Sequence, residues 1–378
     1  MHIIVAPNAF KGSLSAPQTA DCIANGLRES NLTCQVTLFP IADGGDGTAS
    51  LIADKMNSQL IKKIVHDPLG RKIEADFGWV ETSKTAIIEM SEASGLRLLK
   101  QGELDPMKAN TKGTGQLIKA ALDLGATEII TGVGGSATVD GASGLLAELG
   151  VRFLDEHQQE ILNLPEGLIS LKRIDTSGLD PRLKTCKIVV LCDVKNTLLG
   201  EKGAAAVFGP QKGADEKQVK FLERCLKQLN DITRQDLGVE MSSIIHGGAA
   251  GGVAAGLSAF LKTELVSGID YFLGIMDFEK ALKSADLVIT AEGGLDEQTL
   301  EGKGPAGVAK KAKEKNIPVV ILAGSIPREP GKEMRKYFDA IFSIGHGVVP
   351  LNEAIQNTAS DLKRTACELG NILAFIKK

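Results

Sequence analysis

The N-terminus reads Ile3-Ile4-Val5-Ala6-Pro7-Asn8-Ala9-Phe10-Lys11-Gly12-Ser13, an apolar run followed by a polar loop. From Ser15, a good N-cap residue, apolar side chains recur at helical spacing as far as Leu27. A second apolar run covers residues 36–39. Because strand, loop and helix follow one another in this order, the pattern predicts a parallel α/β sheet.

The end of the chain returns to the same pattern. Short apolar runs at residues 287–290, 319–322 and 340–343 are separated by helical patterns, and an apolar stripe from Leu351 to Leu373 predicts a long final helix. Together with the first two runs these make about five parallel strands, which is typical of a flavodoxin-like doubly wound sheet.

The middle of the chain has a different sequence pattern. Residues 59–88 form short alternating runs separated by turn residues, which predicts antiparallel hairpins, and α/β alternation then resumes. We therefore expect an α/β protein with a discontinuous flavodoxin-like domain, residues 1–59 plus 285–378. A large mixed α/β domain, residues 60–284, is inserted into it. The cleft between two such domains is the expected ligand site.

Composition narrows the class of protein. A chain of 378 residues exceeds the usual size of one hydrophobic core, so two domains are expected. The 43 basic and 47 acidic residues give a net charge of −4 without a long run of either sign, which argues against a nucleic-acid surface.

Cysteines and apolar segments indicate the compartment. The six cysteines form no C-x-x-C pair, so they favour free thiols in a reducing cytoplasm over disulfides or a zinc site. The start of the chain has no charged region or apolar signal core. Residues 241–261 are uncharged but rich in glycine, alanine and serine, so we expect no membrane span there.

Lysines, carboxylates and glycines follow the ends of the expected strands. Lys11 follows the first strand, residues 42–48 read Ala-Asp-Gly-Gly-Asp-Gly-Thr after the second, and residues 290–296 read Thr-Ala-Glu-Gly-Gly-Leu-Asp after the third. Gly302-Lys303 comes soon afterwards. Glycine lets backbone approach a ligand closely, and carboxylates suit a divalent cation, a hydroxyl to be deprotonated or a helix cap.

The inserted region carries similar loops at residues 192–193, 209–213 and 247–252. Together they favour a polyanionic ligand held largely by backbone amides, with acids available for a metal or for proton transfer. The chain has neither a Walker A sequence nor the protein-kinase signature set. Phosphoryl transfer would therefore use another scaffold.

A dinucleotide fold is the main alternative. Residues 132–137, Gly-Val-Gly-Gly-Ser-Ala, fit G-x-G-x-x-A after an expected strand, and Asp155 lies where a ribose-binding acid would be expected. Gly141, Ser143 and Gly144 interrupt the helix that this motif requires. An NAD(P)-dependent dehydrogenase of a small hydroxy acid is thus the first alternative function.

The loops taken together resemble the bacterial glycerate kinases of the first type. The resemblance runs from end to end, and the segments that carry it are residues 4–13, 42–48, 88–90, 113–115, 132–141, 192–194, 208–213, 249–252, 292–296 and 302–303. It implies phosphorylation of D-glycerate with ATP and Mg²⁺, usually to 2-phosphoglycerate rather than 3-phosphoglycerate. It also implies a flavodoxin-like domain with an insert that resembles restriction enzymes.

This resemblance and the needs of phosphoryl transfer predict the site residues. The residues expected to contact phosphate through a lysine or a glycine amide are Lys11, Lys212, Lys303, Gly44, Gly45, Gly134 and Gly135. Those expected to bind glycerate are Ser136, Thr138 and Asp140, and Asn8 is a further substrate or phosphate contact. Asp43 and Asp46 are expected to hold Mg²⁺. Asp193 is the expected general base, with Asp296 and Glu292 as second candidates for base or metal.

The chain departs from the family pattern in three loops. Asn8-Ala9 stands where many members have Asp-Ser, and Val139 stands where asparagine is common. In the third loop, Gly294 takes the place of an arginine, and Ala291 takes the place of a glycine. A non-catalytic relative that binds glycerate or nucleotide is therefore the second alternative. The expected partners are D-glycerate and ATP, without nucleic acid or membrane, in a monomer or homodimer.

Overall fold

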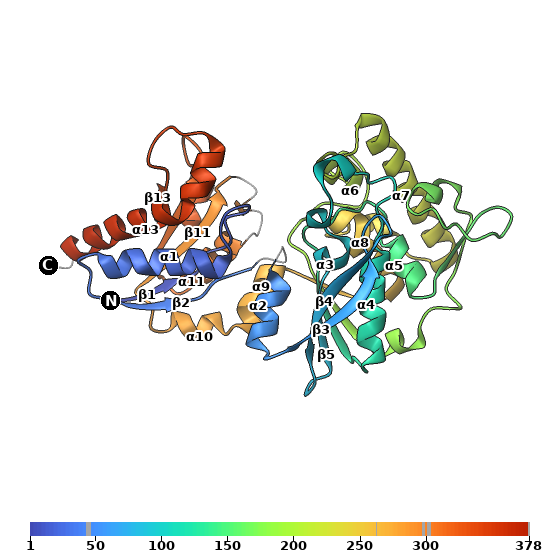
Figure 1. Ribbon diagram of the computed structural model, residues 1–378, viewed down its shortest axis with the longest axis horizontal. Helices are drawn as coiled ribbons and strands as arrows, with labels where there is room; N and C mark the ends of the chain where they lie inside the picture. The colour runs from blue at the N-terminus through green and yellow to red at the C-terminus, as the bar shows by residue number, and fades with distance from the viewer. Residues whose placement is uncertain (43–46, 262, 297–298, 301–303, 377–378) are drawn as a thin grey trace. The chain divides into compact units, whose positions relative to one another are not determined.

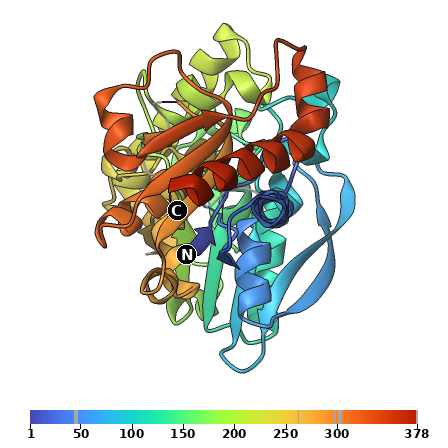
Figure 2. The same cartoon turned by 90° about the vertical axis from the view of Figure 1, so that its left-hand side faces the viewer.

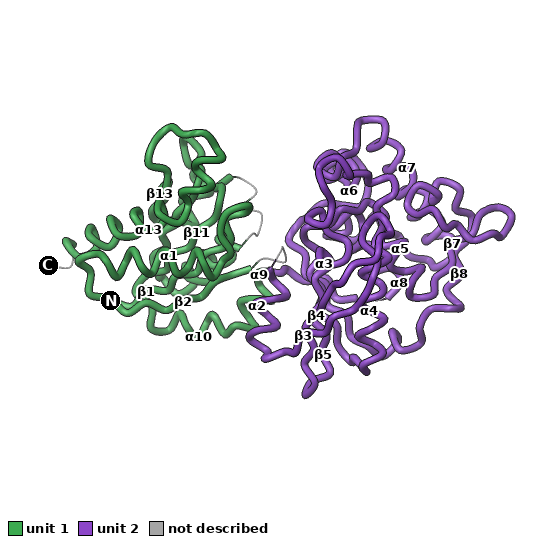
Figure 3. Tube along the Cα trace, in the orientation of Figure 1, with its two compact units in different colours: residues 1–43, 269–378 green, residues 44–268 purple. Residues whose placement is uncertain are grey.

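The computed structural model describes residues 1–378 except 43–46, 262, 297–298, 301–303 and 377–378. The chain forms two compact units, residues 1–43 with 269–378 and residues 44–268 (Figure 3). These limits differ from the expected 59/60 and 284/285. One reason is that the helix α2 (Thr48–Lys55) packs on strands of the second unit. The likeness of the insert to restriction enzymes stays a prediction.

The first unit is built on a parallel sheet with strand order β13-β12-β11-β1-β2 (Figure 1). The strands are β1 (His2–Val5), β2 (Gln35–Leu38), β11 (Leu287–Gly294), β12 (Val319–Ser325) and β13 (Ala340–Ser343). This is the flavodoxin-like order, which reverses between β1 and β11. The predicted doubly wound sheet is confirmed.

Helices accompany these strands in the first unit. They are α1 (Ala16–Glu29), α9 (Gly268–Ile275), α10 (Phe278–Leu282), α11 (Gly304–Lys313), α12 (Lys332–Tyr337) and α13 (Leu351–Ile376). The first and last helices lie side by side (Figures 1 and 2). Ile23 and Leu27 of α1 and Leu362 of α13 are buried with the sheet residues Ile3 and Val5.

The second unit has a six-stranded mixed sheet in the order β10-β9-β6-β5-β4-β3. The strands are β3 (Gln59–His66), β4 (Lys72–Val80), β5 (Thr85–Glu89), β6 (Glu128–Gly132), β9 (Lys187–Leu191) and β10 (Glu264–Val266). The pairs β3–β4 and β4–β5 are antiparallel, as the alternating runs predict, and the other pairs are parallel. A separate antiparallel pair joins β7 (Arg152–Leu154) and β8 (Arg173–Asp175).

Helices of the second unit surround this sheet. Besides α2 they are α3 (Ser91–Ser94), α4 (Lys112–Asp123), α5 (Ser143–Glu148), α6 (Ala204–Phe208), α7 (Glu216–Leu237) and α8 (Ala249–Leu261). Along α7, the side chains of Leu222, Leu226 and Leu229 are buried. None of the helices among the described residues has the length and apolar character that crossing a membrane requires.

Candidate active site

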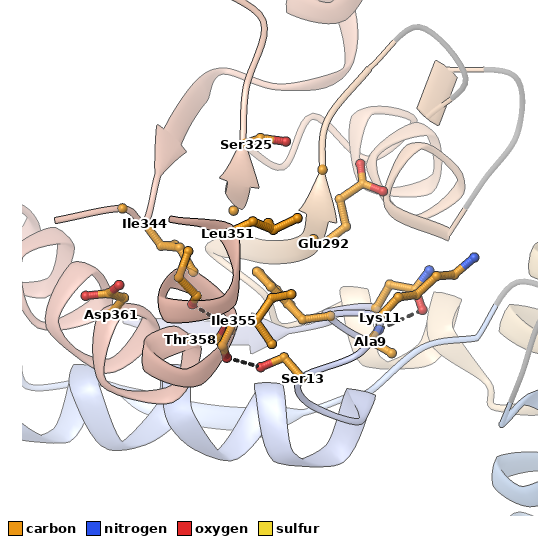
Figure 4. A pocket seen from close by; sticks show the side chains of 17 residues that line it. Ala9, Lys11, Ser13, Glu292, Ser325, Ile344, Leu351, Ile355, Thr358 and Asp361 are labelled. Atoms are coloured by element: carbon orange, nitrogen blue, oxygen red, sulfur yellow. Dashed lines mark hydrogen bonds between the residues drawn. The ribbon is translucent and has the colours of Figure 1, made fainter. Parts of the chain in front are cut away.

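A pocket lies beyond the carboxyl ends of the strands of the first unit (Figure 4). Its volume is about 430 Å³. Its walls come from the loop after β1, the ends of β11, β12 and β13, and the first turns of α13. In doubly wound sheets ligands bind at this edge, where the strand order reverses, so the fold itself marks the pocket as a binding site.

The loop after β1 presents Lys11 to this pocket. The amide of Asn8 donates a hydrogen bond to the carbonyl of Ala291 at 2.8 Å, which continues the sheet into the loop. Phe10 is buried and exchanges two backbone hydrogen bonds with Leu14, of 2.9 and 3.0 Å. Because both ends of the loop are fixed in this way, the exposed Lys11 stands at its tip.

Glu292, at the end of β11, is a lining residue of the same pocket and is only 8% exposed. Its Oε1 accepts a hydrogen bond of 2.8 Å from the hydroxyl of the buried Thr299, and the amide of Thr299 donates to Asp296 Oδ1 at 3.1 Å. Asp296 is exposed and does not line the pocket. The structure therefore brings Asn8, Lys11 and Glu292 together. The predicted residues Asp43, Gly44, Gly45, Asp46 and Lys303 lie outside the described residues.

In the second unit, Lys212 holds the loop that follows β6. Its Nζ donates to Ser136 Oγ at 2.8 Å and to the carbonyl oxygen of Thr138 at 2.7 Å. The side chain is 2% exposed, and this burial lowers the pKa of Lys212 to about 7, against the opposing charge of Asp140. Gly134 is half-buried and Gly135 exposed, so the loop is accessible at that end.

Asp140 anchors the same loop from within. It is fully buried and accepts hydrogen bonds from the amide and hydroxyl of Thr111, at 2.9 and 2.7 Å. The amides of Ala142 and Gly144 also donate to it, each at 3.2 Å. Burial raises the pKa of the Asp140 carboxyl, and these hydrogen bonds oppose that rise. Its contacts therefore fix the loop between the starts of α4 and α5.

Asp193 follows β9, two residues after its last residue. Its Oδ1 accepts hydrogen bonds from the amide of Gly268 at 2.8 Å and from the hydroxyl of Ser267 at 3.2 Å. The side chain is half-buried. A carboxylate held in this way keeps a defined orientation, which proton transfer requires.

Comparison with known proteins identifies the family. The model of the glycerate kinase family matches residues 3–374. The chain belongs to the glycerate kinase family.

Relatives of this family member cover its whole length. It is 43% identical over 377 residues to the glycerate kinase of Bacillus subtilis, with 100% of this chain and 99% of that one covered. It is 40% identical to the glycerate 2-kinase of Escherichia coli over 99% of this chain and 98% of that one. A crystal structure of a protein assigned as glycerate kinase 2 from Salmonella typhimurium LT2 matches with a TM-score of 0.83 and 40% identity, and covers 100% of this chain and 99% of its own.

In this glycerate kinase family member, the dinucleotide fingerprint lacks its expected geometry. The strand β6 ends at Gly132, but the next helix, α5, begins only at Ser143. A dinucleotide-binding turn needs a helix that opens at the glycines, so that its N-terminus faces the pyrophosphate. In the described residues 133–142 the glycines instead belong to a loop.

Sequence reasoning gave no role to several residues that shape these loops. Glu89, the last residue of β5, accepts a hydrogen bond of 2.7 Å from the amide of Gly47, directly after the undescribed acid-and-glycine segment. The position of Glu89, an acidic residue at the end of an apolar strand, could have marked it in the sequence as a candidate site residue. Thr111 and Thr299 gave no such signal, because a single threonine in a loop is common.

Proposed function

We propose that this protein transfers the γ-phosphoryl group of ATP to D-glycerate and produces 2-phosphoglycerate. The observation that carries the proposal is the similarity to a glycerate 2-kinase over nearly the whole of both chains. The positions of loops after parallel strands depend on the fold, so a full-length match supports the same arrangement of the catalytic loops in this protein.

Asp193 is the proposed general base. The hydroxyl oxygen of glycerate attacks the γ-phosphorus and forms a new O–P bond, while the bond from that phosphorus to the bridging oxygen breaks and ADP leaves. The hydroxyl proton passes to Asp193. The hydrogen bonds from Gly268 and Ser267 support this role, because they orient the carboxylate. Glu292 and Asp296 remain the second candidates.

Lys11 is the proposed phosphate contact in the first unit, with Lys303 as a second cation. The exposure of Lys11 at the tip of a fixed loop supports the assignment, because an ammonium there offers a point charge to phosphate oxygens. In the transfer step these oxygens carry most of the charge, so cations that face them lower the barrier.

The loop of residues 134–140 is the proposed glycerate site. Ser136 and Thr138 are its proposed contacts, and the amides of Gly134 and Gly135 add donors to an anion. The contacts of Asp140 and Lys212 support a role in shaping this loop, because both side chains are buried and bonded to it. A direct contact of Lys212 with phosphate or of Asp140 with glycerate stays a prediction.

Mg²⁺ is the proposed metal, with Asp43 and Asp46 as its ligands. Among the residues that the structure describes, no group of three or more His, Cys, Asp and Glu side chains could hold a metal ion. Glu89 supports this proposal, because it accepts a hydrogen bond from the amide of Gly47, the residue that follows Asp46 in the sequence, and carboxylates are the ligands that Mg²⁺ prefers. When bound, Mg²⁺ would neutralise charge on the phosphates.

We further propose a cytoplasmic location. All six cysteines are free thiols, which agrees with a reducing compartment. Burial raises the pKa of the Cys192 thiol to about 12 and those of Cys186 and Cys225 to about 11, so these thiols stay protonated and unreactive. The choice between monomer and homodimer stays a prediction.

An assay with coupled detection of ADP tests the proposal. Purified protein with D-glycerate and MgATP should release ADP, and ADP release should depend on glycerate. The same protein with D-glycerate and NAD should give no absorbance of reduced nicotinamide. ADP release without any dependence on glycerate would contradict the proposed acceptor, and nicotinamide reduction would support the dehydrogenase alternative instead.

A further inference from the structure

The pocket of the first unit has two chemically different walls. Leu351, Ala354 and Ile355 of α13, together with Ile344, form an apolar wall. Strand ends that carry glycine, at residues 293–294, 324 and 345, also line the pocket, and little side chain covers the backbone there. A ligand would therefore pack on hydrocarbon in one part of the pocket and meet peptide groups in another.

The size of this pocket and its apolar wall do not suit glycerate. A volume of about 430 Å³ lies in the range of about 300–1,000 Å³ that is typical of pockets for larger organic ligands. A three-carbon hydroxy acid would fill a small part of it and would meet hydrocarbon where it needs hydrogen-bond partners. A planar purine and its ribose have the size and the flat apolar faces that such a wall accommodates.

Charge orients the ligand within the pocket. Lys11 and Asp361 lie at opposite ends in Figure 4. Asp361 is 7% exposed and already has partners within the protein, because it accepts from His346 Nδ1 at 3.0 Å and pairs with Arg364 Nη2 at 3.4 Å. The ammonium of Lys11 is exposed at the other end. The negative phosphates of a nucleotide would therefore lie toward Lys11.

The apolar wall is fixed before any ligand arrives. Ser13 Oγ donates a hydrogen bond of 2.8 Å to the carbonyl oxygen of Ile355, which ties the loop after β1 to α13. Leu351, on the first turn, is 76% exposed. An exposed leucine at the rim of a preformed pocket gains favourable burial when a ligand covers it.

We propose that this pocket binds the adenosine part of ATP, with the base against Leu351, Ala354 and Ile355 and the phosphates directed to Lys11. The proposal rests on the proposed kinase function, because that function supplies the nucleotide. It assigns the nucleoside to the first unit, in a pocket whose described walls all come from that unit.

Two variants with matched controls test this assignment. Ala354→Trp fills the pocket, and Gln356→Trp places the same side chain on an exposed position of α13 outside it. Leu351→Asp puts a charge on the apolar rim, and Asn352→Asp adds the same charge one residue further on. Because Leu351 is exposed, Leu351→Asp should fold even if the tryptophan variant does not. Calorimetric titration with ADP, without glycerate, measures binding directly.

We expect both pocket variants to bind ADP about tenfold more weakly or worse, with the KM for ATP raised in parallel and the KM for glycerate within about twofold. The two controls should match the unchanged protein. Unchanged ADP affinity in the pocket variants, or a rise in the KM for glycerate alone, would overturn the assignment. If ADP binds and the pocket variants lose it, but glycerate is never phosphorylated, the proposed function fails while the nucleotide site stands.

Discussion

Lys212 Nζ lies 2.8 Å from Ser136 Oγ, although 76 positions separate the two residues in the chain. The same ammonium donates to the carbonyl oxygen of Thr138, so one lysine bonds two points of the loop after β6. Because the group is buried, water does not compete for these hydrogen bonds. The shape of the proposed glycerate loop therefore depends on a distant segment.

This buried lysine should make stability depend on pH. In the folded protein its pKa is lowered to about 7, and in the unfolded chain it returns to about 10.4. Between these values the unfolded state binds more protons, so the free energy of unfolding should rise as the pH increases from about 7 toward about 10. Below about pH 7 the folded protein carries the full cost of burying the charge.

Lys212→Met removes this titration. Urea unfolding at about pH 7 and about pH 9 should show that the unchanged protein gains roughly 2 kcal/mol more than the variant over that interval. Other titrating groups are common to both proteins and cancel in the comparison. Parallel pH dependence of the two proteins would show that Lys212 is not buried with a lowered pKa. The variant should also raise the KM for glycerate, because the loop loses two hydrogen bonds.

Gly251→Ala should disturb the same loop from the other side. Gly251 has a φ of 71°, and an added Cβ would lie 2.0 Å from the carbonyl oxygen of Thr138. Gly238 is a matched control, because its φ is 70° and an added Cβ would meet nothing within 4 Å. Each alanine costs about 1 kcal/mol of backbone strain, and the clash at Gly251 should cost about 2 kcal/mol more. Equal urea midpoints for the two variants would rule out this packing.

Asp193→Asn should cut kcat roughly 100-fold or more while ATP still binds, because the amide cannot accept the hydroxyl proton. Ser267→Ala removes one hydrogen bond to Asp193 Oδ1 but leaves the carboxylate, so its loss in kcat should be smaller, about tenfold at most. Steady-state kinetics with ADP titrations separate the two effects. Near-normal turnover of Asp193→Asn would remove Asp193 from the role of base.

Gly294→Arg should strengthen ATP binding, because it adds to the pocket the cation that the resemblance to the family predicts at this position. An added Cβ would lie 3.0 Å from Ser325 Oγ, a side chain that can rotate away. We expect the KM for ATP to fall about threefold, with a stronger dependence on salt, whereas Gly294→Gln should lack both effects. The same KM in the arginine and glutamine variants would contradict a phosphate site at this position.

The sheet of the first unit follows from local pattern. Its strands are short apolar runs between helical patterns, and burial on both faces makes such runs recognisable. The boundaries between the two units cannot be predicted from local sequence pattern. The pattern of α2 shows an apolar face but not that β4 and β5 cover it, because that packing joins segments far apart in the chain.

In the candidate site, too, some features follow from the local sequence and others do not. Acids and glycines after strands mark the loops, so Lys11 and Glu292 could be predicted to meet at one edge. Lys212 could not be predicted to be buried, because a lysine is normally exposed and its two oxygen partners come from a distant loop. Likewise, the apolar stripe of α13 predicts a buried face but not that Leu351 borders an open pocket.

Phosphorus NMR of the reaction of this protein with D-glycerate and MgATP tests the central claim most directly. The account predicts ADP and one new phosphomonoester signal, split into a doublet by the single proton on C2 of 2-phosphoglycerate. A triplet, from the two protons on C3, would contradict the proposed position of phosphorylation. The absence of any new phosphomonoester, with protein that is folded and binds ADP, would contradict the proposed function itself.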